Sequence, residues 1–135
     1  MAKIKWKIPS FVNEFGEIER VQRQLRVDTS FVSKFIHAEK TATLVPLTSK
    51  IWDNLENTDS NLLGTGSWDY VANCAQHTKR DWETLRDRMM AGAEMDSPII
   101  YHCNGIYHLV SGNTRLMVAK ALGITPMVVI IERLM

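Results

Sequence analysis

The segment with the clearest chemical potential is Ser111-Gly112-Asn113-Thr114-Arg115, which joins an apolar stretch to a helix-forming stretch. The first turn of a helix presents backbone N–H groups that have no partner within the helix, and these groups favour a bound anion. Gly112 allows the backbone to approach a ligand closely, and Asn113 or Thr114 can cap the helix or add a hydrogen bond. The segment therefore predicts a binding site for an anion such as phosphate.

Arg115 is the unusual residue of this segment. A cation in the first turn of a helix opposes the helix dipole at a cost of about 0.3–1 kcal/mol. An anion bound between the guanidinium and the helix would offset that cost. The alternative interpretation is structural, with Gly112 as a turn residue, Asn113 or Thr114 as a cap, and Arg115 as the partner of a nearby carboxylate. The sequence contains neither a Gly-x-x-x-x-Gly-Lys loop nor a Gly-x-Gly-x-x-Gly motif.

Two further groups of charged residues are candidates for binding. Glu94 and Asp96 precede an apolar stretch and could hold Mg²⁺ against a bound nucleotide, whereas the alternative is a solvated loop. Arg20, Arg23 and Arg26 lie on the polar side of a predicted helix and are candidates for contacts with a DNA backbone. The alternative for these arginines is an ordinary solvated face.

The histidines and cysteines do not predict a structural metal site. A two-residue turn at Asn104-Gly105 would pair residue 102 with 107 and 101 with 108, which places His102 and His108 on opposite faces of the hairpin. Cys74 and Cys103 have no Cys-x-x-Cys spacing and are expected to be small buried residues. No residue stands out as a catalytic base.

The elements that position the Ser111–Arg115 segment are clearest in the C-terminal third. Residues 97–103 and 106–110 predict two antiparallel strands, because Asn-Gly is typical of a type I′ turn. A helix is expected over 115–122, and the apolar run at 127–131 predicts a strand that is covered on both faces. We expect the second strand, this helix and the last strand to form a right-handed parallel crossover.

The N-terminal part is predicted to be mainly helical. Alternation over residues 2–8 indicates one half-buried strand. Apolar residues at helical spacing then predict a helix at 17–26 and a second one after Asp28, followed by helices after Pro46, after Ser67 and around Trp82.

The composition restricts the class of protein. A chain of 135 residues with 45% hydrophobic and 23% charged residues fits one globular domain, and excludes collagen-like, coiled-coil and disordered proteins. No apolar run approaches the ~20 residues of a membrane helix, so no membrane partner is expected. An N-terminus without a signal-peptide pattern and only two cysteines predict a cytoplasmic protein. The net charge of +1 argues against a non-specific DNA-coating protein.

The region from Asp81 to Ile131 resembles the core of the ParB/sulfiredoxin superfamily. The similarity rests on the order of Pro98-Ile99, a hairpin through Gly105, and a Gly112-x-x-Arg115 turn that opens a helix containing Ala119 and Ala121. The resemblance implies an α/β (α+β) fold with a small mixed sheet. It divides the single domain, 1–135, into a helical N-terminal elaboration, 1–80, and a ParB-like core, 81–135.

In that superfamily the Gly-x-x-Arg turn holds nucleotide phosphates. The resemblance therefore implies a nucleotide triphosphate, ATP or CTP with Mg²⁺, bound by the turn Ser111, Gly112, Asn113, Thr114 and Arg115. Asn113 and Thr114 stand where sulfiredoxins have cysteine and histidine and where partition proteins have glutamate and arginine. Sulfiredoxin chemistry is not expected, because an amide cannot act as a thiolate.

The leading hypothesis is a nucleotide- or phosphate-binding ParB-like protein, similar to small phage-encoded relatives. Because some members of the superfamily are kinases, ATP-dependent phosphotransfer is the enzymatic form of this hypothesis. The alternative is a non-enzymatic DNA-associated or protein-interaction module in which the turn binds backbone phosphate. A third interpretation makes the turn a purely structural cap.

Overall fold

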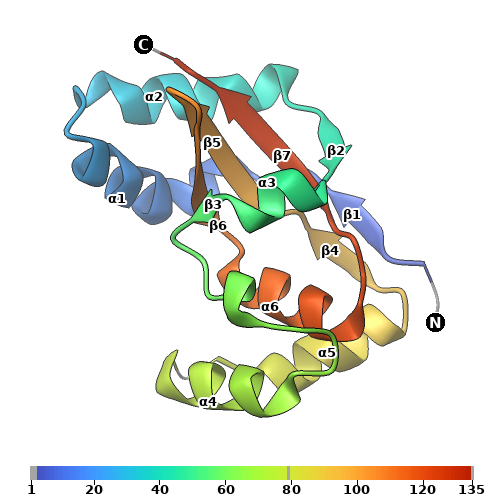
Figure 1. The fold of residues 1–135 in the computed structure, drawn as a ribbon. Helices are drawn as coiled ribbons and strands as arrows, with labels where there is room; N and C mark the ends of the chain where they lie inside the picture. The colour runs from blue at the N-terminus through green and yellow to red at the C-terminus, as the bar shows by residue number, and fades with distance from the viewer. Residues whose placement is uncertain (1–2, 79, 135) are drawn as a thin grey trace.

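The protein has an α+β fold, seen in a computed structural model that describes residues 3–78 and 80–134. A five-stranded mixed sheet has the order β2-β7-β5-β6-β3 (Figure 1). Its strands are β2 (Leu44–Pro46), β3 (Leu55–Glu56), β5 (Ile99–Cys103), β6 (Ile106–Ser111) and β7 (Met127–Glu132). A smaller parallel pair is formed by β1 (Lys5–Lys7) and β4 (Glu94–Asp96).

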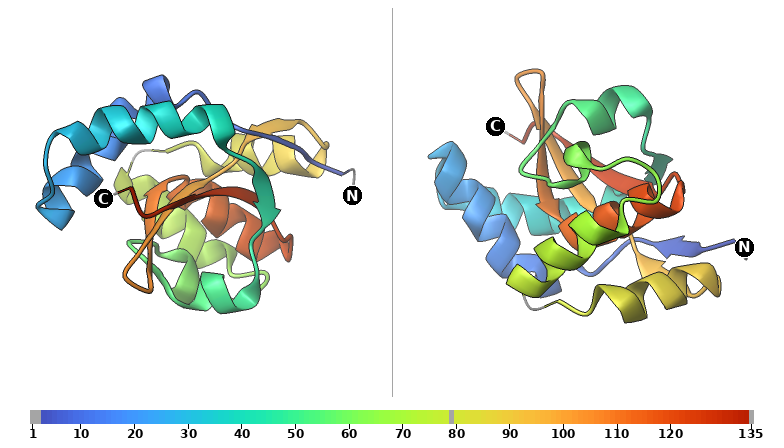
Figure 2. Two further views of the ribbon diagram at one scale, coloured as in Figure 1. Left: turned by 90° about the horizontal axis from the view of Figure 1, so that it is seen from above. Right: turned by 60° about the horizontal axis from the view of Figure 1, so that its bottom comes forward.

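Helices cover both faces of the larger sheet. On one face lie α1 (Phe15–Leu25), α2 (Ser30–His37) and the short 3₁₀ turns η1 (Phe11–Glu14) and η2 (Ala38–Thr41). On the other side lie α3 (Ser49–Asp53), η3 (Ser60–Leu62), α4 (Trp68–Thr78), α5 (Trp82–Met90) and α6 (Asn113–Leu122). The view from above shows these layers with the sheet between them (Figure 2).

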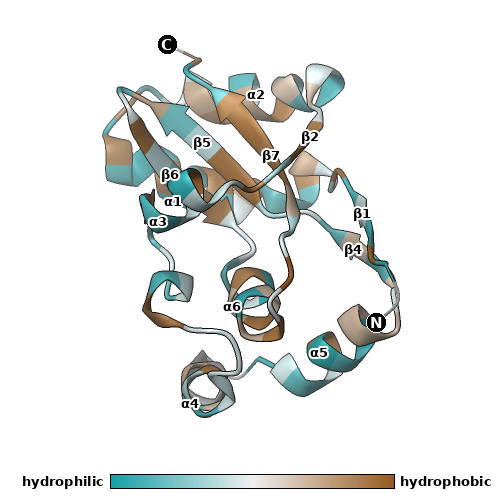
Figure 3. Ribbon diagram, turned by 45° about the vertical axis from the view of Figure 1, so that its right-hand side comes forward, coloured by the Kyte–Doolittle hydropathy of each residue, from teal (hydrophilic) through white to brown (hydrophobic). Residues whose placement is uncertain are grey.

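The alternation of side chains along the strands produces one apolar core on each face. Along β5, Ile99 and Tyr101 pack with the phenylalanines of α2, whereas Ile100 packs on the opposite side with Leu116 of α6. β7 also contributes to both cores, and it is apolar along most of its length (Figure 3). The prediction that residues 127–131 form a strand covered on both faces is therefore confirmed.

The predicted hairpin is present with the expected register. Asn104 and Gly105 have φ angles of 54° and 78°, and residue 102 pairs with 107 while 101 pairs with 108. The helix predicted after Asp28 is also confirmed. The Asp28 carboxylate accepts a hydrogen bond from Ser30 N at 2.7 Å, at the start of α2.

The predicted parallel crossover is wrong. β7 pairs with β5 in parallel, and β5 separates it from β6, which runs antiparallel to β5. Since the hairpin returns the chain to the beginning of β5, α6 starts and β7 begins at that same end of the sheet. An apolar strand is also stabilised most where both of its faces are buried, and the position beside β5 provides this.

The N-terminal residues are integral to the sheet. β2 and β3, which lie within residues 1–80, form its two edges by pairing with β7 and β6. β1 covers only the centre of the strand predicted at 2–8, and it pairs with β4, which contains Glu94 and Asp96. In the described part of the chain, none of the helices combines the length and the apolarity that crossing a membrane requires.

Candidate functional site

The turn between β6 and α6 depends on a glycine. Gly112 is the N-cap of α6 with a φ of 106°, and no side chain caps this end of the helix. A Cβ atom at this position would lie 2.8 Å from Pro98 Cβ, which is closer than real side chains approach. Because no side chain caps this end, the first backbone N–H groups of α6 have no capping hydrogen bond.

A cleft lies at this turn and brings together residues that are distant in the sequence. Its volume is about 240 Å³. One wall is the segment from Leu109 to Arg115, which contains the whole predicted site. The remaining lining residues come from the start of α1 and from two loops, and they are Glu14, Glu17, Arg20, Asn57 and Arg80.

Arg115 is held in the wall of the cleft without an ion pair. Its Nη1 donates a hydrogen bond to the backbone oxygen of Asp96 at 2.6 Å. No carboxylate of the described residues lies within 4.0 Å of its guanidinium nitrogens. Burial lowers the pKa of Arg115, whereas the nearby Glu14 and Asp96 carboxylates raise it. The structural alternative, in which Arg115 is the partner of a nearby carboxylate, is thus met only by these two longer-range interactions.

Arg80 is a second cation at the cleft, and it was not predicted from the sequence. Its Nη1 donates to Thr114 Oγ1 at 2.8 Å, across 34 residues of sequence. The residue lies between α4 and α5, and nothing in its local sequence links it to the turn at Gly112. Two guanidinium groups thus flank the start of α6.

Ser111 and Glu14 face one another in the same cleft. Ser111 is 8% exposed, and its buried hydroxyl has no hydrogen bond of normal geometry. The hydroxyl is nevertheless close enough to lower the pKa of the Glu14 carboxyl slightly. Burial, the larger effect, raises the pKa of Glu14, and the Arg115 guanidinium opposes that rise. Glu14 was also missed, because no motif marks it.

The Asn113 side chain makes three hydrogen bonds within the protein. Its Oδ1 accepts hydrogen bonds from Thr58 Oγ1 at 2.9 Å and from Asp59 N at 3.0 Å. Its Nδ2 donates to Asp59 Oδ2 at 3.1 Å. The side chain thus attaches the loop before η3 to the start of α6. The backbone N–H of Asn113 remains available to a ligand.

Glu94 and Asp96 are brought together, but with a lysine between them. Lys7 Nζ lies 2.9 Å from Glu94 Oε1 and 3.6 Å from Asp96 Oδ1. The hydrogen bond from Lys7 lowers the pKa of Glu94. Within residues 3–78 and 80–134, no cluster of three or more His, Cys, Asp or Glu residues could hold a metal. A Mg²⁺ ion at Glu94 and Asp96 would have to displace Lys7.

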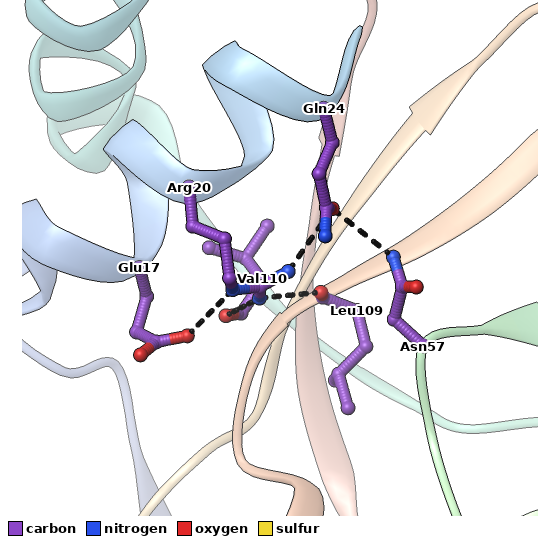
Figure 4. A network of polar contacts seen from close by, with 6 residues as sticks. All are labelled: Glu17, Arg20, Gln24, Asn57, Leu109 and Val110. Atoms are coloured by element: carbon purple, nitrogen blue, oxygen red, sulfur yellow. Dashed lines mark hydrogen bonds and ion pairs between the residues drawn. The ribbon is translucent and has the colours of Figure 1, made fainter.

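The three arginines of the predicted DNA contact have different environments. Arg20 donates to Glu17 at 3.1 Å, to Gln24 at 3.1 Å and to the Val110 backbone oxygen at 2.9 Å (Figure 4). The bonds to Glu17 and Gln24 lie within α1, whereas the bond to the Val110 oxygen attaches α1 to the end of β6.

The other two arginines lie further along α1. Arg23 forms an ion pair with Glu19 at 3.1 Å, and Arg26 is the left-handed C-cap of the helix. Arg20 is therefore the arginine of this set that lines the cleft.

The two histidines of the hairpin lie on opposite faces, as the predicted pairing of its strands requires. His102 stacks on Tyr107 with a centroid distance of 4.1 Å, and its Nδ1 lies 2.7 Å from Glu132 Oε2. His108 is paired with Tyr101 on the opposite face of the hairpin. The two imidazoles cannot share one ion.

Comparison of the chain with protein-family models, with curated proteins and with solved structures finds no match.

Proposed function

We propose that this protein binds the phosphate group of a nucleotide in the cleft at the start of α6. The proposal includes a ParB/sulfiredoxin-like core, and the order of hairpin, Gly112 turn, helix and apolar strand supports it. The observation that carries the proposal is the uncapped N-terminus of α6 flanked by Arg80 and Arg115 in one cleft. Backbone N–H groups and guanidinium groups are the donors that bind phosphate oxygens most strongly.

The energetics of Arg115 favour an anion at this position. A largely buried guanidinium is costly unless its charge is compensated. The Asp96 backbone oxygen satisfies one donor, and the Glu14 and Asp96 carboxylates act on Arg115 without an ion pair, so they offset the effect of its burial only in part. A phosphate beside Arg115 would supply further negative charge and would also interact favourably with the positive end of the helix dipole.

The size of the cleft indicates which part of a nucleotide it recognises. Pockets that enclose a whole small molecule have volumes of about 300–1,000 Å³. The cleft has about 240 Å³, so it can surround a phosphate group while the sugar and base extend outward. Phosphotransfer would need a base and metal ligands in addition, and Lys7 pairs with both candidate ligands. Binding is therefore the function that we propose.

The DNA-associated alternative has less support from the site. The Arg20 donors are engaged by α1 and β6, and Arg23 is paired with Glu19.

Isothermal titration and thermal-shift measurements with ATP, CTP, GTP and a short DNA duplex, with and without Mg²⁺, test the proposal. A ligand of the folded state raises the melting temperature by mass action. Arg80→Ala is the main variant, because Arg80 is exposed and its loss should not unfold the protein. We expect nucleotide binding to weaken by about 10- to 100-fold, the effect of losing a charge-assisted hydrogen bond.

Arg23→Ala is the matched control, since it removes an arginine from α1 that is paired with Glu19. Its nucleotide affinity should equal that of the wild type. The proposal fails if no nucleotide binds at millimolar concentration, or if Arg80→Ala and Arg115→Gln both bind as the wild type does. Binding of the DNA duplex alone, with a steep loss at higher salt, would overturn it in favour of the alternative.

A further inference from the structure

We infer that the cleft selects a phosphate group that carries a proton, and that Glu14 is the specificity-determining residue that accepts the hydrogen bond of its P–O–H group. The ligand class is then a terminal phosphate monoester or inorganic phosphate in its hydrogen phosphate form. This inference rests on the proposed function and names the chemical form of the phosphate bound there.

The position of Glu14 is the first observation. Glu14 precedes α1 as its N-cap residue, yet its side chain does not cap the helix and instead lines the cleft. The 3₁₀ turn that carries it is anchored, because Phe11 is fully buried and Phe11 N donates to Glu39 Oε1 at 2.6 Å. Glu14 is thus held in place by packing rather than by bonds of its own carboxylate.

The second observation is the environment of the Glu14 carboxylate. No ion pair within 4.0 Å reaches it from the described residues. Ser111, which is more than nine-tenths buried, lies beside this carboxylate, and its hydroxyl lowers the pKa of Glu14 as a hydrogen-bond donor does. This hydroxyl has no other partner in the described part of the chain. The Glu14 carboxylate therefore keeps acceptor positions for a donor in the cleft that it lines.

The cleft therefore offers donors on one side and an acceptor on the other. Arg80, Arg115 and the N–H groups of α6 require acceptor oxygens from the ligand, whereas Glu14 requires a donor. Sulfate and phosphodiesters carry no proton near neutral pH, so they would place an anion against the Glu14 carboxylate. A hydrogen phosphate group satisfies both sides, since the second pKa of a phosphate monoester is about 6.

The charged groups that face Glu14 determine the pH dependence. Arg115 stabilises the ionised carboxylate, Glu17 and Asp96 oppose it, and burial favours the protonated form. Glu17 is itself paired with Arg20. For a phosphate monoester at low pH, one proton is shared between Glu14 and the ligand, whereas above the second pKa of the monoester both groups are ionised and repel one another. Inorganic phosphate still carries one proton in that range and can still donate it to Glu14. Binding of a monoester such as AMP should therefore weaken as the pH rises above its second pKa.

The test is isothermal titration in EDTA at about pH 6 and about pH 8. The probes are inorganic phosphate, inorganic sulfate, AMP as a monoester and cyclic 3′,5′-AMP as a diester. We expect the wild type to bind phosphate or AMP at least about tenfold more tightly than sulfate or the cyclic diester. The preference for AMP over the cyclic diester should decrease from the lower to the higher pH, because AMP loses its last phosphate proton in this range. Tighter binding of AMP than of phosphate would identify the monoester as the ligand, and the reverse would identify free phosphate.

Glu14→Gln keeps the size of the side chain and removes its charge. Its carboxamide can donate to any oxygen, so we expect the preference for phosphate over sulfate to fall below about threefold, and the preference for AMP over the cyclic diester to lose its dependence on pH. Glu19→Gln, in the helix α1 that follows Glu14, is the matched control and should keep the wild-type preference. Ser111→Ala provides a second variant and should weaken binding of phosphate without abolishing the preference for it.

The outcomes separate this inference from the proposed function. Equal binding of sulfate and phosphate by the wild type would overturn the role of Glu14 and leave the phosphate site intact. A preference that appears only when Mg²⁺ is added would also overturn it, because the proton would then not be the recognised feature. No binding of any phosphate compound would remove both proposals.

Discussion

Gly112 and Pro98 are packed so closely that a Cβ atom on the glycine would lie 2.8 Å from Pro98 Cβ and 2.9 Å from Pro98 Cα. Pro98 directly precedes β5, the central strand of the larger sheet, so this contact ties the start of α6 to the sheet. The φ of 106° at Gly112 adds a second requirement for glycine. The position of the turn at the start of α6 is thus determined by the backbone.

Gly112→Ala should destabilise the protein by about 2–5 kcal/mol, since backbone strain and a clash with Pro98 act together. Urea unfolding measures the effect. Gly16→Ala is the control, because Gly16 lies in α1 and a Cβ atom added there would have no neighbour within 4 Å. This control should stabilise the protein by up to about 1 kcal/mol. Equal stabilities of Gly112→Ala and the wild type would contradict the packing described.

Asn113→Ala should reduce stability by about 1–3 kcal/mol, because it leaves Thr58 and Asp59 without their hydrogen-bond partner. Nucleotide affinity should change by less than about threefold, since the amide side chain is engaged within the protein. Denaturant unfolding and titration on the same variant provide both values. A large loss of affinity at unchanged stability would show that the Asn113 side chain contacts the ligand instead.

Arg20→Gln should cost about 1.5–3 kcal/mol of stability, because its guanidinium donates to the backbone oxygens of Leu109 and Val110 at the end of β6. Arg23→Gln removes only an exposed ion pair with Glu19 and should change stability by less than about 0.5 kcal/mol. Thermal and urea unfolding of the two variants would compare them directly. If both have the same stability, Arg20 does not attach α1 to the sheet.

The stability of the protein should depend on the ionisation of Glu14. Because burial raises its pKa above the ordinary 4.5, the folded state holds the proton more tightly than the unfolded state does. The free energy of unfolding therefore falls as the pH rises from about 4.5 through the pKa of the folded state. Glu14→Gln should be more stable than the wild type at neutral pH. This difference in stability should disappear below about pH 4.5, where Glu14 is protonated in both the folded and the unfolded state.

Unfolding curves of the wild type and Glu14→Gln across this pH range measure the effect, with Glu19→Gln as the control. The control should follow the wild-type curve. A Glu14→Gln protein that loses stability at neutral pH would mean that the ionised Glu14 stabilises the fold through Arg115, which is the opposite of the effect expected from burial.

Several features of the site follow from neighbouring residues alone. Asn104-Gly105 specifies the hairpin and its register, because both positions require a positive φ that these residue types tolerate. Gly112 and Gly123 mark the two ends of α6, because both positions have a positive φ that glycine tolerates. The polar side of α1 and the apolar side of α2 follow in the same way from helical spacing.

The composition of the cleft could not be predicted in this way. Arg80 reaches Thr114 across 34 residues, and Asn113 reaches Thr58 across 55. Such contacts depend on how α4, α5 and the loop before η3 pack against α6, and local propensities carry no information about that packing. The same is true of Lys7, which pairs with Glu94 and Asp96 because β1 adds to β4 in parallel.

The sequence by itself determined the local geometry around Gly112, and it singled out Arg115 as a cation at an unfavourable position. Only the tertiary structure decided that β7 lies beside β5, that Arg115 forms no ion pair with a carboxylate of the described residues, and that Glu14 lines the same cleft. The physical reason is that turns and helix ends depend on the conformational limits of a few adjacent residues. The order of strands and the contents of a cleft depend instead on burying apolar surface throughout the chain.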